Sequence, residues 1–121
     1  MANALNWFEI PVSNMARAKQ FYSTILAAKL EDYPFAQEYK MAMIPTENGV
    51  GGALLQGKGY TPSHDGALVY LNGGDDLKVV QDRIESAGGK VLREKMSIGD
   101  NGFVAFFEDS EGNRVGLHSM A

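Results

Sequence analysis

The stretch WFEIPVSNMARAKQFY, residues 7–22, decides the fold expected for this chain. Residues 7–12 alternate in character, which places aliphatic side chains on one face of a strand and Trp7 and Glu9 on the other. The Ser-Asn pair that follows can cap a helix by accepting a hydrogen bond from an early backbone N–H. The remaining apolar residues recur at three- and four-residue spacing, which is typical of an amphipathic helix. The stretch therefore predicts a strand, a turn and a helix that runs towards residues 27–28.

The same order returns in the second half of the chain. An apolar run at residues 67–71 is followed by a Gly-Gly-Asp turn and by a helical pattern that we expect to start at Asp75 or Asp76. The pair Gly88-Gly89 predicts where this helix ends, because glycine adopts the left-handed conformation at a helix C-terminus without penalty. Further strands are expected at residues 37–45, 50–56, 90–97 and 102–108 and after residue 113.

This repetition predicts an α+β fold with two tandem βαβββ modules that form a curved mixed sheet around a cleft. The modules are about residues 1–60 and 61–121, and the turn-rich segment 57–66 that joins them is too short to separate independent domains. A chain of 121 residues has room for one core, so we expect a single domain over residues 1–121. The cleft between the modules is where a ligand is expected.

Composition argues against several classes of function. The formal net charge is −4 and the basic residues are scattered rather than gathered in a stripe, so no nucleic-acid partner is expected. Apolar runs are too short to span a bilayer, and we expect no membrane partner. The chain has no Cys, which excludes disulfides and thiolate chemistry. The first residues do not resemble a secretory signal, and a cytoplasmic location is expected.

Residues 7–22 resemble the opening of the vicinal oxygen chelate superfamily, which includes glyoxalases, bleomycin-resistance proteins and extradiol dioxygenases. In that superfamily a strand leads through a V-x-D/N turn into a helix that carries Arg-Ala-x-x-Phe-Tyr, as residues 17–22 do here. Residues 101–113, NGFVAFFEDSEGN, are similar to its closing strand and D-P-x-G-N turn. The resemblance covers essentially the whole chain and implies the same two-module fold.

The resemblance also implies where a metal ion would be held. Metal-dependent members use His or Glu side chains from both modules, and their positions correspond here to Trp7, Ala53 or a neighbour, Leu68 or Val69, and Gly116. None of these side chains offers the oxygen or imidazole donor that a hard divalent ion needs. We therefore expect no metal and no other cofactor, with Trp7, Ala53, Val69 and Gly116 at the usual ligand positions.

The side chains expected to line the cleft are Trp7, Glu9, Tyr39, Met41, Phe103, Phe107 and His118. Glu9 and His118 each lie two residues from an implied metal position, hence on the same strand faces, and they are the candidate catalytic residues. Three interpretations of this pair remain open: proton transfer or ligand anchoring, a structural hydrogen bond at the cleft floor, and part of a non-standard metal site.

Other polar residues are secondary candidates. Arg17 and Arg114 are able to anchor an anionic ligand, with exposed salt bridges as the alternative. His64 lies in the joining segment and is expected to be solvated.

The resemblance implies two functions between which the sequence does not decide. One is a metal-free protein of the bleomycin-resistance type that binds a small organic molecule in an aromatic-lined cleft. The other is a lyase or isomerase of the glyoxalase type, with Glu9 and His118 as acid and base or as part of a non-standard metal site. In either case the partner is a small-molecule ligand. We also expect a homodimer, because a chain of two modules has exposed sheet edges to cover.

Overall fold

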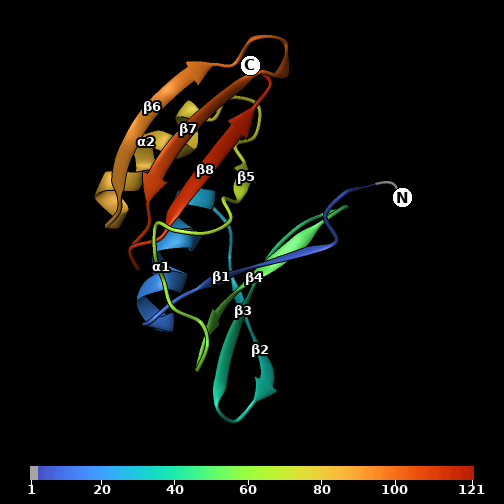
Figure 1. Cartoon of the computed structure of the whole chain (residues 1–121), viewed down its shortest axis with the longest axis vertical. Helices are drawn as coiled ribbons and strands as arrows, with labels where there is room; N and C mark the ends of the chain where they lie inside the picture. Colours follow the sequence, from blue (N-terminus) through green and yellow to red (C-terminus); the bar gives the residue numbers. More distant parts are fainter. Residues whose placement is uncertain (1–2) are drawn as a thin grey trace.

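The computed structural model describes residues 3–121, except for the side chains of residues 35 and 36. Over these residues the chain follows the order βαβββ twice (Figure 1). The first module contains β1 (Trp7–Pro11), α1 (Met15–Leu26), β2 (Glu31–Ala36), β3 (Tyr39–Ile44) and β4 (Gly51–Gln56). The second contains β5 (Tyr70–Asn72), α2 (Lys78–Ala87), β6 (Lys90–Ser97), β7 (Phe103–Glu108) and β8 (Arg114–Ser119). The predicted pair of βαβββ modules is confirmed.

Each module builds its own four-stranded mixed sheet. The strand order is β1-β4-β3-β2 in the first sheet and β5-β8-β7-β6 in the second. In both sheets the module's first strand runs parallel to its last one, and the other neighbours are antiparallel. Pro11 ends β1 at an edge of its sheet, where a missing backbone N–H costs least. The α+β class is thus confirmed, with one sheet in each module.

The helix α1 follows from local chemistry. Asn14 has an extended backbone just before the helix, and its side chain accepts a hydrogen bond from the backbone N–H of Arg17. The buried side chains of the helix recur at the predicted spacing: Met15, Ala18, Phe21, Tyr22 and Ile25. Ala27 then takes the left-handed conformation, and its backbone N–H bonds back to the last turn, which ends the helix.

The helix α2 begins later than the sequence predicts, at Lys78 rather than at Asp75 or Asp76. The side chain of Asp76 accepts a hydrogen bond from the backbone N–H of Lys78, so this acid forms a local turn that precedes the helix. The helix stops at Gly88, where φ is 109°, as expected for a left-handed glycine cap. In the described part of the chain, neither helix has the length and apolar character needed to cross a membrane.

Two strands differ from the prediction. The strand expected at residues 67–71 is confined to Tyr70–Asn72, where it pairs with β8. The strand β2 is not predicted by the pattern, because Asp32 and Pro34 both disfavour a strand. Its place at an edge of the first sheet explains why a proline is tolerated there, since no strand follows on that side.

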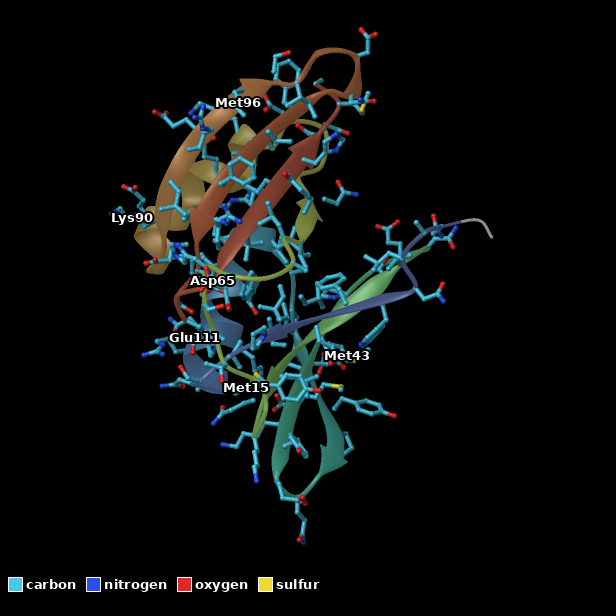
Figure 2. All side chains as sticks on the ribbon, viewed as in Figure 1. Met15, Met43, Asp65, Lys90, Met96 and Glu111 are labelled. Carbon is cyan, nitrogen blue, oxygen red and sulfur yellow. The ribbon has the colours of Figure 1, made fainter. Side chains whose placement is uncertain are left out.

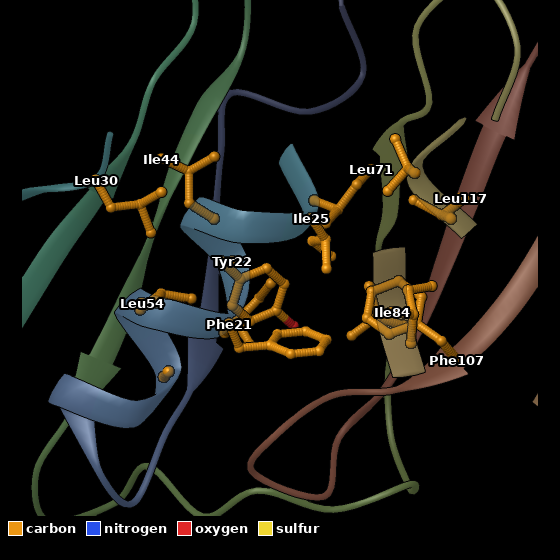
Figure 3. Packing of buried hydrophobic residues seen from close by; sticks show 14 of the residues in the cluster. Phe21, Tyr22, Ile25, Leu30, Ile44, Leu54, Leu71, Ile84, Phe107 and Leu117 are labelled. Atoms are coloured by element: carbon orange, nitrogen blue, oxygen red, sulfur yellow. The ribbon is translucent and has the colours of Figure 1, made fainter. Parts of the chain in front are cut away.

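Both modules contribute to one hydrophobic core. The helices α1 and α2 pack against each other, and each sheet turns one face towards them. Figure 3 shows Phe21 and Tyr22 of α1 between Leu54 of the first sheet and Phe107 of the second. The ring centroids of Phe21 and Phe107 are 6.0 Å apart. The helices leave the opposite face of each sheet uncovered, and we call these the first-sheet face and the second-sheet face.

The turn between β7 and β8 joins the second module to the start of α1. Glu111 in this turn accepts hydrogen bonds from the backbone N–H groups of Ser13 (2.9 Å) and Asn14 (2.8 Å), which precede the helix. Its carboxylate also pairs with Arg17, whose Nε lies 2.7 Å from Oε2. The side chain of Glu111 has no exposed surface, and Figure 2 shows it at the junction between the two sheets. A carboxylate of the second module thus caps a helix of the first.

Asp109 makes a second, buried contact in the same junction. The hydroxyl of Tyr22 in α1 donates to Oδ2 of Asp109 at 2.6 Å. The side-chain amide of Asn113 donates to the same oxygen and to the carbonyl of Pro11 at the end of β1. Burial, reinforced by the charge of Asp109, raises the pKa of Tyr22 well above 10, so its hydroxyl remains a donor.

The surroundings of Glu111 make stability depend on pH. Burial by itself raises the pKa of this carboxyl, but the hydrogen bonds from Arg17, Asn14, Ser110 and Ser13 together outweigh it and lower the pKa from 4.5 to about 2. Because the folded-state pKa is the lower one, the stabilisation is complete above pH 4.5 and is lost as the pH falls towards 2. Its size is on the order of 3 kcal/mol.

We expect Glu111→Gln to lower the free energy of unfolding by about 2 kcal/mol at neutral pH, because an amide loses the charge that attracts Arg17. The difference from the wild type should shrink as the pH falls from 4.5 to 2, which urea unfolding at each pH measures. Glu47→Gln is the matched control: Glu47 lies in the corresponding turn of the first module, is exposed and makes no ion pair within residues 3–121. A difference for Glu111→Gln that does not change with pH would contradict this account.

Candidate functional site

The first-sheet face carries Trp7 and Glu9, as the alternation of β1 predicts. The register places Trp7 beside Gly51 of β4 and Glu9 beside Ala53. A small apolar cluster lies on this face, apart from the main core: Met41, Ala53 and Leu55, with Met43 and Tyr60 packed against it. Three of the predicted cleft residues, Trp7, Glu9 and Met41, therefore share one sheet face.

Glu9 is held by its neighbours on this face. Its Oε1 accepts a hydrogen bond from the hydroxyl of Tyr60 at 3.0 Å, and its Oε2 accepts one from the indole N–H of Trp7 at 3.4 Å. The hydrogen bond to Glu9 raises the pKa of Tyr60. Tyr39, a fourth predicted cleft residue, meets Tyr60 edge-on with ring centroids 6.0 Å apart. Glu9 thus links Trp7 and Tyr60 by hydrogen bonds in an aromatic patch on the first-sheet face.

The second-sheet face is a grid of side chains in three rows that run across the strands. The first row consists of Asn72, His118, Val104 and Met96. The second row consists of Tyr70, Gly116, Phe106 and Arg93. The third row consists of Arg114, Glu108 and Lys90. In Figure 2, Met96 and Lys90 lie towards opposite ends of β6 and mark the extent of the grid.

A pocket of about 580 Å³ lies over the first two rows. It is lined by Tyr70, Met96, Ile98, Val104, Phe106 and His118. The rings of Tyr70 and Phe106 are 5.9 Å apart and form an aromatic floor. Gly116 makes this floor possible, because a Cβ at that position would stand 2.6 Å from the ring of Tyr70.

His118 has a defined orientation in this pocket. Its Nε2 lies 2.6 Å from the carbonyl oxygen of Asn101, in the short turn Gly99–Asn101. A carbonyl can only accept, so Nε2 carries the proton and donates it to this bond. In the neutral imidazole Nδ1 is then the acceptor, and it makes no hydrogen bond within residues 3–121.

The segment 57–66 connects the two faces. It contributes Tyr60, which the sequence analysis does not identify as a site residue. Tyr60 packs on the first-sheet face, whereas Nε2 of His64 lies 2.7 Å from Oε2 of Glu108 on the second. From its place in the segment, His64 is expected to be solvated only, but the structure pairs it with Glu108. Four extended residues span at most about 14 Å, which limits the distance between the backbones of Tyr60 and His64.

Two predicted cleft residues lie elsewhere, and their assignment was wrong. Phe107 is fully buried in the main core, and Phe103 packs against the same core. Successive residues of a strand point to opposite faces, so Val104 and Phe106 line the second-sheet face instead. The strand FVAFFE is apolar on both faces, and its alternation therefore does not reveal which face meets the helices.

The candidate catalytic pair is not brought together within the chain. Glu9 belongs to the first sheet and His118 to the second, and the hydrogen bonds of each go to other residues.

Of the two arginines considered for anion binding, Arg17 is engaged with Glu111 in the junction. Arg114 makes no ion pair among the described residues and stays available on the second-sheet face.

The residues at the metal positions implied by the resemblance do not fit a divalent ion. Trp7, Ala53 and Gly116 have no suitable donor atoms. At the remaining position, Leu68 and Val69 are both aliphatic and offer no donor atom either, and Val69 packs against the core. The Tyr70 ring also fills the space that a longer side chain at Gly116 would need. Within residues 3–121, no three His, Asp or Glu side chains are arranged to hold a metal ion.

Comparison with protein families identifies the group to which this fold belongs. Residues 4–117 match the model described as Glyoxalase/Bleomycin resistance protein/Dioxygenase superfamily. The chain is also 26% identical over 118 residues to "Putative glyoxylase CFP32" from Mycobacterium tuberculosis (strain CDC 1551 / Oshkosh). The match covers 93% of this chain and 44% of that relative, so the chain spans less than half the length of the relative.

Several solved structures share this fold. A glyoxalase/bleomycin resistance protein from Streptomyces sp. CB03234 is 26% identical, with a TM-score of 0.72 over 95% of this chain and 100% of that one. TnmS3, an antibiotic binding protein from the same organism, is 23% identical, with a TM-score of 0.71 over 100% and 99% of the two chains. A glyoxalase I mutant from Zea mays is 24% identical, with a TM-score of 0.69 over 95% of this chain and 46% of that one. With its two βαβββ modules and a family match over nearly its whole length, the chain belongs to the glyoxalase/bleomycin resistance protein/dioxygenase superfamily.

Proposed function

We propose that this protein binds a small organic molecule, without a metal ion, in the pocket on the second-sheet face. The observation that carries the proposal is the pocket itself, in which the aromatic floor of Tyr70 and Phe106 adjoins the oriented imidazole of His118. A largely apolar lining with few oriented polar groups is typical of small-molecule sites. The antibiotic binding protein TnmS3 has the same fold, which is compatible with such a role.

The proposal includes a cytoplasmic homodimer. Each sheet has two edge strands, β1 and β2 in the first and β5 and β6 in the second, and such edges favour association. Large aromatic side chains are exposed on both open faces: Trp7 has 40% of its surface exposed and Tyr70 has 47%. Association of two copies would remove this apolar surface from water and would enclose the open pocket.

Ligand binding is expected to raise the melting temperature, because a ligand that binds only the native state stabilises it by mass action. A thermal-shift screen with aromatic antibiotics and small metabolites measures this. Phe106→Ala should lower the affinity for any compound found by roughly tenfold or more, since it removes half of the aromatic floor. Val79→Ala is the control, because Val79 is exposed on α2, away from the pocket. If no compound raises the melting temperature, the proposal fails.

A second candidate function is proton transfer by a lyase or isomerase of the glyoxalase type. One observation favours it: the bond from Nε2 of His118 to Asn101 leaves Nδ1 as an oriented acceptor at the pocket. For compounds that raise the melting temperature, Glu9→Gln and His118→Ala should each abolish turnover if the pair is catalytic. Both substitutions should change the affinity only modestly if the pocket binds these compounds without converting them. Steady-state assays for conversion of these compounds separate the two functions.

The homodimer is tested by multi-angle light scattering. At micromolar concentration the expected mass is twice the 13.2 kDa of the chain. Because apolar contact would hold the two copies together, the mass should change little when salt is added. A monomer at this concentration would refute the dimer and leave the ligand-binding proposal to be judged separately.

A further inference from the structure

Arg93 stands at the edge of the pocket with unused hydrogen-bond donors. It lies on β6 directly beside Phe106 of β7. One of its terminal nitrogens lies 3.2 Å from the sulfur of Met96, a residue that lines the pocket. A thioether is a weak acceptor, so this contact leaves most of the five guanidinium N–H groups available. Arg93 is exposed and makes no ion pair within residues 3–121.

The second-sheet face is cationic although the chain is acidic. The formal net charge of the chain is −4. The three rows of the grid nevertheless contain Lys90, Arg93 and Arg114 against one carboxylate, Glu108. That carboxylate is hydrogen-bonded to His64 at 2.7 Å, whereas no ion pair occupies the three cations among the described residues. The local field therefore favours a negatively charged ligand.

The surface next to Arg93 suits a flat ring. Gly116 lies between Phe106 and Tyr70 in the second row and presents no side chain there, so the aromatic rings on either side form the floor. Neighbouring strands are about 5 Å apart, which places the middle of this floor roughly 10 Å from the backbone of Arg93. A ring system of bicyclic size over this floor brings a substituent within reach of the extended guanidinium.

We propose that the pocket takes a planar aromatic anion, with its ring on Tyr70 and Phe106 and its carboxylate or similar group bound by Arg93. This inference rests on the proposed small-molecule function and adds the chemical class of the ligand. The planar fork of a guanidinium group matches a carboxylate with two parallel hydrogen bonds. The ring supplies apolar contact, and the ion pair distinguishes this class from neutral aromatic compounds.

Two isosteric probes test the proposal: naphthalene-2-carboxylate and naphthalene-2-carboxamide, titrated into the full chain by calorimetry at low salt. The two have the same ring and nearly the same shape but differ in charge. The carboxylate should bind roughly tenfold more tightly than the amide, because a hydrogen bond to a charged group contributes more than one to a neutral group. Added sodium chloride should weaken binding of the carboxylate and leave that of the amide unchanged.

Substitution at Arg93 assigns the effect to this residue. Arg93→Gln should reduce the affinity for the carboxylate roughly tenfold, to that of the amide, and leave the amide within about twofold. Arg93→Lys keeps the charge and should restore part of the loss. Lys40→Gln is the control: it removes an equal charge from an exposed lysine of β3 that makes no ion pair within the described chain, and both affinities should stay unchanged.

The outcomes separate this inference from the function on which it rests. Equal affinity of the wild type for the two probes would overturn the preference for anions and leave small-molecule binding intact. A different outcome is that Arg93→Gln weakens binding of the carboxylate and of the amide equally, at an unchanged melting temperature. Arg93 would then only maintain the shape of the pocket, and the proposed ion pair would be overturned. Failure of both probes to bind would overturn the ligand class, and the thermal-shift screen would then judge the function separately.

Discussion

The buried contact between Tyr22 and Asp109 is the interaction on which the rest of the structure depends. Tyr22 and Asp109 are almost completely buried, and Asn113 supplies a further hydrogen bond to the same carboxylate. A buried carboxylate without such donors is strongly destabilising. Because α1 belongs to the first module and the β7–β8 turn to the second, these bonds form only when the modules pack in one relative position. Glu111 strengthens the same junction by capping α1.

This packing determines which surfaces are available for function. One face of each sheet is used by the shared core, and the candidate site lies on one of the other two faces. These faces differ although the modules repeat. The first holds Glu9 between Trp7 and Tyr60, whereas the second presents His118 and Arg93 around an aromatic floor. The repeated architecture thus carries an acidic aromatic patch on one sheet, and on the other an aromatic pocket that shares its face with Lys90, Arg93 and Arg114.

The extent to which the site was predictable differs from residue to residue. Trp7 and Glu9 were assigned correctly to the open face, because β1 has an aliphatic face and a mixed one. Phe107 was assigned to the wrong face, because β7 is apolar on both and its alternation has no polar reference. Arg93 was not identified as a site residue, because in the sequence it is adjacent to Glu94 and its charge indicates a solvated cluster of charged residues. Only the pairing of β6 with β7 places it next to Phe106.

Sequence alone determined the two βαβββ modules, the limits of α1 and the absence of metal-binding side chains at the positions that the resemblance implies. These features rest on periodicity, on caps such as Asn14 and on residue chemistry, all of which act over a few neighbouring residues. Tertiary structure alone decided strand register, the shared core, the pairing of His64 with Glu108 and the pocket over Gly116. Each of these joins segments far apart in the chain, and their contacts depend on how whole sheets and helices pack, which no local pattern encodes.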